Sequence, residues 1–423
     1  MSEADAGGRP TTWNRPFARL AREAGWTYYA VAVVGRLPFA MAVVGVVGFL
    51  VISTGSYELS GWCSALIGVG AAVGGPLLGR AVDRWGQRRV LLPYIAVYVL
   101  ALLCLIWLVT VGAQEAAVLA TAAVIGLASP QVSPMSRSRL AAMAEQTLPH
   151  SQVTPATRTM LGVESFIDEI TFVIGPAAVG VVSLAFGTAV PIIAAAALTA
   201  VAGVAFACHP TARFVRGAAR RPGEGHAAAK GARWAWAHPR ILVLALSLLA
   251  IGGFFGSTLI DVTRFAGASG VPQLAGLVYA GTGVGSAVFA LLVTFLPDRF
   301  SLEARSIVFA TITACAALAI AFVSSLPAMA IVLAAAGAGI GPALVTTFSA
   351  AAARSSAADR TTVMTLLGAG LILGQSLGSA IAGALVQANI PSGAATVAAA
   401  SAVLLLLLSL GNFALFRSRP AAA

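Results

Sequence analysis

Three carboxylates lie inside an otherwise apolar stretch of the sequence. Residues 164–176 read ESFIDEITFVIGP and include Glu164, Asp168 and Glu169. Glu164 and Asp168 fall on one face of a helix, one turn apart, whereas Glu169 is rotated by about 100°. In a lipid environment an ionised carboxylate costs at least about 2.5 kcal/mol unless it is paired or reaches water. Each acid must therefore be paired, hydrated or protonated, and an acid that is protonated part of the time can carry protons.

One counter-ion lies at a matching depth. Arg36, in RLPFAMAVVG, follows Thr27 by nine residues, and Asp168 follows Arg158 by ten, so both are expected about 14 to 15 Å along their helices. An arginine can bind a carboxylate through two nitrogens. It cannot neutralise three acids, so we expect at least one to exchange protons near neutral pH. The alternative is a static ion pair that joins two helices while the remaining acids face water.

Composition identifies the environment of these residues. The chain has 423 residues, of which 59% are hydrophobic and 10% charged, and its mean hydropathy is +0.90. A soluble protein needs more charge to cover its surface, so an integral membrane protein is predicted. Lys+Arg 26 against Asp+Glu 15 gives a net charge of +11. Basic residues gather in cytoplasmic loops, and no basic run is interleaved with base-stacking aromatics, so no nucleic-acid partner is expected.

The cysteines and histidines show no site pattern. The four cysteines are scattered singly in apolar segments, and the four histidines fall in polar connections, so we expect no metal and no cofactor. The chain has no HExxH motif of a metalloprotease and no Walker motif GxxxxGK[ST]. We therefore expect neither an enzyme nor direct use of ATP.

Twelve segments are long enough to cross a hydrocarbon core of about 30 Å. Connections on one side carry arginines, including Arg137, Arg139 and Arg158 between the fourth and fifth segments, whereas those on the other side carry none except Arg264. The positive-inside rule then predicts a multi-pass protein of the cell inner membrane with both termini cytoplasmic. The expected spans are 27–53, 62–82, 90–112, 116–136, 159–186, 189–208, 241–263, 272–296, 305–325, 328–352, 362–388 and 394–416.

The longest connection separates two sets of six spans. LLGRAVDRWGQRR after the second span has a degraded counterpart, FLPDRFSLEAR, after the eighth, which indicates a duplication. The predicted fold is an all-α membrane protein with twelve transmembrane helices in two six-helix bundles. Its expected parts are a cytoplasmic N-terminal segment 1–26, a bundle 27–208, a cytoplasmic central loop 209–240, a bundle 241–416 and a cytoplasmic tail 417–423.

The connection after the second span carries the most specific motif. GRAVDRWGQRRV contains Gly79, Asp83, Arg84, Gly86, Arg88 and Arg89. We expect Gly79 to permit close helix approach and Gly86 a tight turn. The motif resembles the loop signature of the major facilitator superfamily, with Ala81 and Gln87 as departures. The resemblance implies a latch that joins the two halves in the outward-facing state. A loop that only satisfies the positive-inside rule is the alternative.

The fifth span carries a second motif. Within GVESFIDEITFVIGPAAVG, Gly162, Gly175 and Pro176 fall in register with the helix-five signature of drug/proton antiporters, which the segment resembles in part. The resemblance implies export, and a glycine face that packs against the other half. Such antiporters also carry an arginine deep in helix four. The stretch VLATAAVIGLASPQVSP contains none, so Arg36 is the candidate substitute.

The resemblance also implies a solute cavity lined by spans one, four, seven and ten. Side chains of the same types often serve only in packing. A cavity with few charges suits an amphipathic or apolar solute. Asp261 and Arg264 are expected to pair near the outer end of span seven. The candidate solute contacts are Gln131, Ser133, Phe254, Phe255, Thr258 and Thr346.

These observations predict a secondary transporter. Its expected activity is export of a small organic solute, drug-like or a secondary metabolite, in exchange for protons by alternating access, and it is expected to act as a monomer in the bilayer. The alternative is a proton-coupled or facilitative importer of a sugar or another small nutrient. A channel or receptor is disfavoured by the two-half repeat and the loop signature.

Overall fold

The computed structural model describes residues 14–215, 239–297, 300–355, 360–390 and 392–417. Within this part of the chain the regular structure is entirely helical, and twelve helical segments have the length and composition to cross a membrane. The predicted all-α class and number of spans are confirmed. Most of the predicted central loop, the start of the N-terminal segment and the end of the tail lie outside the described residues.

The first six spans follow a short helix whose Leu20 is fully buried. Spans one, four and six are each made of more than one helical piece. The elements are α1 (Asn14–Ala24), α2 (Trp26–Val34), α3 (Leu37–Thr54), α4 (Tyr57–Trp85), α5 (Gln87–Thr110), α6 (Glu115–Leu127), α7 (Val132–Thr147), α8 (His150–Phe186), α9 (Val190–Leu198), the π-helical turn η1 (Thr199–Gly203), α10 (Val204–Cys208) and the 3-10 turn η2 (Pro210–Val215).

The second six spans are mostly single helices. The elements are α12 (Pro239–Ala268), η3 (Pro272–Leu274), α13 (Ala275–Leu292), η4 (Val293–Phe295), α14 (Leu302–Ala319), η5 (Ile320–Phe322), α15 (Leu326–Arg354), α16 (Arg360–Gln387) and α17 (Gly393–Arg417). Short 3-10 turns extend α13 at both ends and α14 at its C-terminal end.

Spans one and four are broken next to prolines. Arg36 lies at the joint between α2 and α3, and Pro38 is the second residue of α3. In span four, Ala128–Gln131 separates α6 from α7 and contains Pro130. Proline lacks the backbone N–H that a continuous helix would use, so both spans are interrupted at these points. Broken helices release polar backbone groups at membrane depth, which is a common feature of transporter binding sites.

Span four is longer than the sequence predicts. We expect it to end at residue 136 and the next span to begin at 159, but α7 continues to Thr147 and α8 begins at His150. The expected loop is therefore almost wholly helical. The stretch from Met135 to Thr147 contains neither Gly nor Pro, so nothing local stops the helix. As a result Arg137 and Arg139 lie on a helix and not in a loop, which corrects their assignment.

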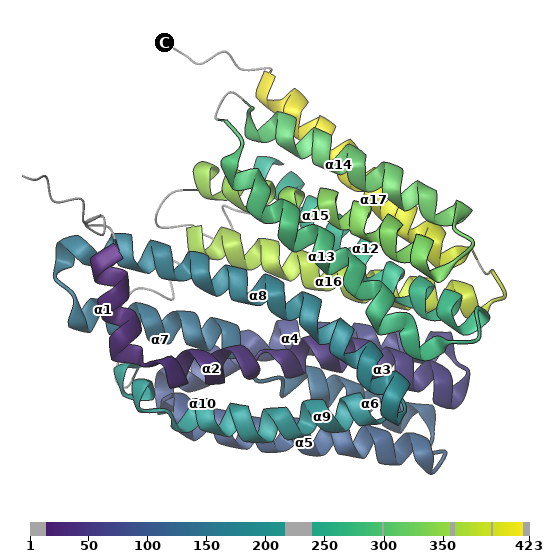
Figure 1. The fold of residues 1–423 in the computed structure, drawn as a ribbon, viewed down its shortest axis with the longest axis horizontal. Coiled ribbons are helices and arrows are strands. Elements are labelled where there is room, and N and C mark those ends of the chain that lie inside the picture. Colours follow the sequence, from purple (N-terminus) through teal and green to yellow (C-terminus); the bar gives the residue numbers. More distant parts are fainter. Residues whose placement is uncertain (1–13, 216–238, 298–299, 356–359, 391, 418–423) are drawn as a thin grey trace, which may run out of the picture.

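The two halves meet along two pairs of helices. α4 packs against α16, and α8 packs against α13; in Figure 1 the first half lies below and the second half above, with α8 along the boundary. We call these contacts the α4–α16 seam and the α8–α13 seam. At the first seam the Tyr57 backbone N–H donates to Gln387 Oε1 at 3.0 Å, and the Ser64 and Ser379 hydroxyls lie 3.1 Å apart. These contacts lie toward the end of the molecule away from the arginine-bearing connections.

Candidate functional site

Arg36 binds two of the three acids of α8. It is buried at the α2–α3 joint, and its Nη2 pairs with Glu164 Oε2 while its Nε lies 3.1 Å from Asp168 Oδ1. Glu164 is only 1% exposed. The break in span one matters here because it allows a long side chain to reach across to α8 from the interior of the first half. The pairing of a buried arginine with two carboxylates lowers the cost of burying all three.

A second arginine completes the neutralisation of this group. Arg137, on α7, places Nη2 at 2.6 Å from Asp168 Oδ2, and the Ser133 hydroxyl donates to the same oxygen at 2.7 Å. No arginine is expected within helix four from the sequence, because its predicted end at residue 136 lies before Arg137. The continuation of α7 supplies one. Arg36, Arg137, Glu164 and Asp168, together with Ser133, are called the charge cluster below.

The charge cluster is balanced and partly open. Two arginines face two carboxylates within the first half. The side chains of Asp168 and Arg137 are 20% and 38% exposed, whereas Glu164 is enclosed. An exposed charge against hydrocarbon would cost several kcal/mol, so this open side must face water. The charge cluster therefore has a buried side at Glu164 and a water-exposed side at Arg137.

Glu169 stands apart from the charge cluster. It is turned away from Asp168 by the helical rotation and faces α13, where the Ser286 hydroxyl is the polar side chain near its carboxyl. Ser286 is buried in the second half. In the described part of the chain, no arginine, lysine or histidine pairs with Glu169. One acid therefore lies on the α8–α13 seam without a counter-ion.

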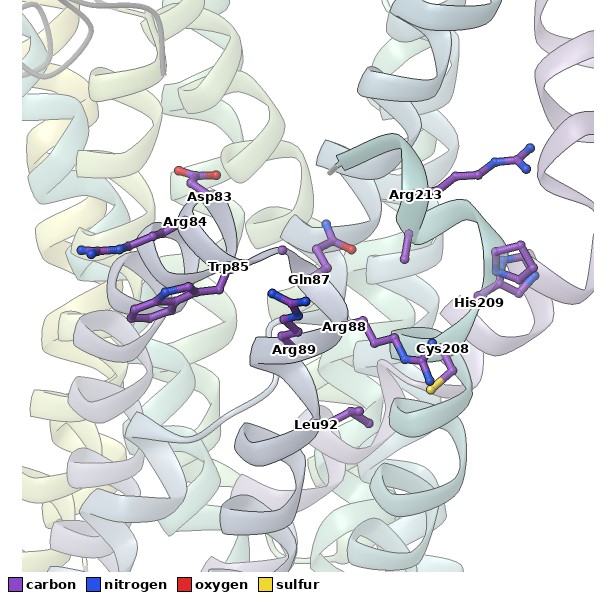
Figure 2. A pocket seen from close by; sticks show the side chains of 13 residues that line it. Asp83, Arg84, Trp85, Gln87, Arg88, Arg89, Leu92, Cys208, His209 and Arg213 are labelled. Atoms are coloured by element: carbon purple, nitrogen blue, oxygen red, sulfur yellow. The ribbon is translucent and has the colours of Figure 1, made fainter. Parts of the chain in front are cut away.

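Among the described residues, no ion pair joins the loop-signature residues to the other half. Asp83, Arg84, Arg88 and Arg89 are exposed at the end of α4 and the start of α5 and surround a cavity together with residues of α10 and η2 (Figure 2). The backbone of Gly86 is left-handed, with φ of 83°, and allows the tight turn expected of it. Added atoms at Gly79 would meet nothing within 4 Å, so its expected role in close helix approach is wrong for this structure.

The helix-five motif packs differently from its expected pattern. A Cβ on Gly175 would lie 2.6 Å from the Cβ of Ala40, which belongs to α3 of the same half, and one on Gly162 would meet nothing within 4 Å. Close contact with the other half is made instead by Pro176 and Gly180, which pack against the start of α13. α8 therefore does pack closely against the other half, but the rotation of the helix about its axis places Pro176 and Gly180 at this contact, and not Gly162 and Gly175.

The solute-contact candidates occupy mixed environments. Ser133 belongs to the charge cluster, and Gln131 precedes α7 as its N-cap. Phe255 is half-buried, with its ring centroid 6.3 Å from that of Phe254. The side chains of Phe254, Thr258 and Thr346 are buried. The structure does not bring the six candidates together as one exposed surface, and their contact with solute stays a prediction.

The expected pair at span seven is present. Arg264 Nη2 lies 3.0 Å from Asp261 Oδ1, and Asp261 is buried. A further sequence feature of the second half is GQSLG at 374–378, which has the letters of the GxSxG nucleophile motif. It lies within the continuous helix α16, where the strand-to-helix turn that exposes such a serine does not exist. Its glycines Gly374 and Gly378 instead approach the α12 backbone.

Arg139, which the sequence predicts to lie in a loop, is a buried charge. It is fully buried on α7, where Nη2 and Nε donate to Gln87 Oε1 at 2.6 and 2.9 Å, and Nη1 donates to the Phe206 carbonyl and the Thr211 hydroxyl. Its guanidinium also stacks 4.0 Å from the Phe206 ring centroid. Neutral oxygens and an aromatic face therefore replace a carboxylate partner. No group of three or more His, Cys, Asp or Glu side chains among the described residues is arranged to hold a metal.

Comparisons with known proteins agree with this architecture. The family model of the Major Facilitator Superfamily matches residues 28–272 and 264–423. The fold is similar to the crystal structure of the nucleoside transporter NupG, with a TM-score of 0.72 and 15% identity over 93% of this chain and 98% of that one. An auto-inhibited peptide transporter of the POT family gives a TM-score of 0.65 and 13% identity over 94% and 98%. No curated sequence matches this chain.

Proposed function

The chain belongs to the major facilitator superfamily of transporters, and we propose that it exports a small organic solute in exchange for protons by alternating access. One observation carries the proton coupling. Of the three acids on α8, Glu164 and Asp168 are paired with Arg36 and Arg137, whereas Glu169 lies against the other half, near the Ser286 hydroxyl and without an ion-pair partner among the described residues. The structural neighbours share only the fold at these identities and do not decide the solute.

Glu169 is the proposed proton carrier. A carboxylate enclosed at the α8–α13 seam without a cation would be costly, and the neutral acid can donate a hydrogen bond to Ser286. When α8 and α13 separate, water enters and the ionised form is no longer penalised. Protonation and closure of the seam then favour each other. Proton binding is thereby linked to the conformational change that moves the solute.

The charge cluster is a fixed group of charged side chains on the same helix as Glu169. Its two arginines and two carboxylates are neutral as a group, so they can face the solute pathway without themselves needing protons. The open side at Arg137 and Asp168 offers a cation and an anion side by side. Asp168 is the second candidate for the proton carrier, because it is the more exposed of the two acids in the cluster.

The contacts between the halves suggest which step of the cycle is seen. If the arginine-bearing connections are cytoplasmic, the seam contacts of Tyr57 with Gln387 and of Ser64 with Ser379 close the outer side. This is the arrangement expected of an inward-facing state. The loop-signature residues are exposed in it, in agreement with a latch that is made only when the cytoplasmic side closes.

Transport in proteoliposomes with an imposed pH gradient tests the proposal. Ethidium serves as an apolar, cationic probe of antiport, and radiolabelled uridine as a probe of the importer alternative. We expect ethidium to accumulate in vesicles with an acidic lumen, and Glu169→Gln to reduce accumulation to the level without a gradient. The seam variant Ser379→Ala, on the uncharged side, should keep the gradient response.

Other results would change the assignment. Ethidium movement that ignores the gradient in the wild-type chain contradicts antiport. Uridine uptake driven by external acid supports the nutrient importer instead. A normal response in Glu169→Gln together with its loss in Asp168→Asn moves the proton site to the charge cluster.

A further inference from the structure

A basic cavity lies outside the proposed transport pathway, at the end of the first half. Its volume is about 760 Å³, and it is bounded by the end of α4, the start of α5, the end of α10 and η2 (Figure 2). Four arginines line it with one acid, Asp83. In the described part of the chain none of the four guanidinium groups has a carboxylate partner. The lining arginines are Arg84, Arg88, Arg89 and Arg213.

The walls of the cavity are held together from inside. Buried Arg139 donates to Gln87 at the start of α5, and also to the Phe206 carbonyl and Thr211 beside the opposite wall. Gln87 in turn donates to the Met135 carbonyl at 3.2 Å. A single fully buried guanidinium thus fixes the spacing between α5 and the α10–η2 segment. The unpaired arginines are carried on a rigid frame and not on a free loop.

The surface next to the cavity is apolar and exposed. α5 packs beside η1 and α10, as the lower edge of Figure 1 shows. Leu100 on α5 is 65% exposed and Val201 on η1 is 73% exposed. Trp85 lines the cavity and is 56% exposed, which is typical of tryptophan at the boundary of a membrane. The helices that bound the basic pocket therefore also carry exposed apolar side chains farther along.

We propose that this cavity binds the headgroup of an anionic phospholipid, with its acyl chains along α5 and the η1–α10 segment. A phosphate diester accepts two hydrogen bonds from one guanidinium, and four arginines against one acid favour a net negative headgroup. A zwitterionic headgroup would bring an ammonium group for which Asp83 is the only acid in the lining. Free phosphate would use the arginines but gain nothing from the apolar surface. Basic pockets of this kind between membrane helices suit anionic lipids.

Arg213 separates this site from the loop latch. Arg84, Arg88 and Arg89 belong to the loop signature, so their substitution would affect both a latch and a lipid site. Arg213 lies on η2, outside the signature, and is one of the residues that line the cavity. A lipid site requires both walls, whereas a latch made by the signature alone does not require Arg213.

The site is tested on the purified full chain in detergent. Dioleoylphosphatidylglycerol and dioleoylphosphatidylcholine are titrated separately, and bound lipid is measured by native mass spectrometry. Occupancy of the cavity is followed by the rate at which N-ethylmaleimide modifies Cys208, which lines it, with exposed Cys315 on α14 as internal control. We expect phosphatidylglycerol to be retained more strongly and to slow modification of Cys208 but not of Cys315.

Variants then locate the headgroup. Each arginine near a lipid surface contributes about a fivefold gain in binding, so Arg213→Gln should weaken phosphatidylglycerol binding about fivefold, and Arg88→Gln with Arg213→Gln about 25-fold. Lysine at both positions should restore most of the binding, which shows that the fold is intact. Arg22→Gln removes an exposed arginine of α1 that does not line the cavity and should change nothing.

Three outcomes overturn the proposal. The first is equal retention of the two lipids by the wild-type chain. The second is an equal loss of binding in Arg22→Gln, or no loss in Arg213→Gln, because either would mean that the cavity is not the binding place. The third is protection of Cys208 by inorganic phosphate at the same concentration as by phosphatidylglycerol, which would make this a site for a free anion.

Discussion

The two seams between the halves are packed alike but differ in chemistry. At the α4–α16 seam a Cβ on Gly383 would lie 3.2 Å from the Cα of Gly61, and at the α8–α13 seam a Cβ on Gly276 would lie 2.6 Å from the Pro176 carbonyl oxygen. Both seams thus depend on glycine for close backbone approach. The described contacts of the first use hydroxyl, amide and backbone groups. The second contains Glu169, and the charge cluster lies behind it on the same helix.

Because of this difference, both seams can take part in closing the two halves, but only one of them can couple closure to proton binding. A duplicated fold supplies two similar hinge surfaces, but only one of them carries an acid whose charge depends on whether the seam is wet. The α4–α16 seam can therefore open and close with little dependence on pH, whereas opening of the α8–α13 seam should depend on pH. Variants of the charged seam and matched variants of the uncharged seam should therefore differ in their response to pH.

The largest effect is expected on removal of Arg36. Arg36→Ala leaves Glu164 buried without its cation, which should lower the free energy of unfolding by about 3–5 kcal/mol. Adding Glu164→Gln should recover part of this loss, because the unpaired charge is then gone. Thermal unfolding of the two single variants and the double variant measures the coupling. Purely additive losses would contradict the ion pair.

A smaller effect is expected when a methyl group is placed in either seam. Gly276→Ala and Gly383→Ala should each cost about 1–3 kcal/mol of unfolding free energy, because the new Cβ overlaps the backbone of the facing helix. Gly411→Ala is the control, since a Cβ there meets nothing within 4 Å, and it should be neutral or stabilising. Denaturant unfolding of all three gives the comparison. An equal cost at all three sites would mean that the seams are not closely packed.

Removing one hydroxyl from each seam tests the chemical difference directly. Ser379→Ala deletes the bond with Ser64 and should cost about 0.5–1.5 kcal/mol at every pH. Ser286→Ala should cost a similar amount at low pH and more at high pH, where Glu169 would be ionised and would lose its donor. Unfolding measured at pH 5.5 and pH 8.5 distinguishes the two. Identical pH profiles would remove the proposed role of Glu169.

The smallest effect is expected at His209, which lies away from both seams. Burial, and then the nearby Arg139 guanidinium, lower the pKa of His209 below its ordinary value of 6.5. The folded state then binds fewer protons than the unfolded state, so this contribution is complete above pH 6.5 and is lost as the pH falls toward the lowered pKa. His209→Gln should flatten the decline in melting temperature between pH 7.5 and pH 5.5. An unchanged decline would assign it to other groups.

The charge cluster shows which parts of the site can be predicted from residue spacing along single helices. The rise of a helix is constant, so counting residues from the ends of spans one and five was enough to place Arg36 near Asp168 in depth. The same counting did not place Arg137 in a helix, because the positive-inside pattern favoured a loop at this position, whereas α7 continues through it. The uninterrupted stretch after Pro134 was the available signal. Arg139 was missed for the same reason, and its neutral partners come from three different elements.

The sequence by itself determined the membrane environment, the twelve spans and the family, because hydropathy, arginine placement and the loop motif are properties of short stretches of chain. Tertiary structure decided which residues of α8 face which neighbour. Gly175 meets α3, Gly180 meets α13, and Glu169 meets Ser286, since a helix distributes its residues around its axis and only packing sets its rotation. The separation of Glu169 from Asp168, one residue apart in the chain, exists only because two different helices cover their two faces.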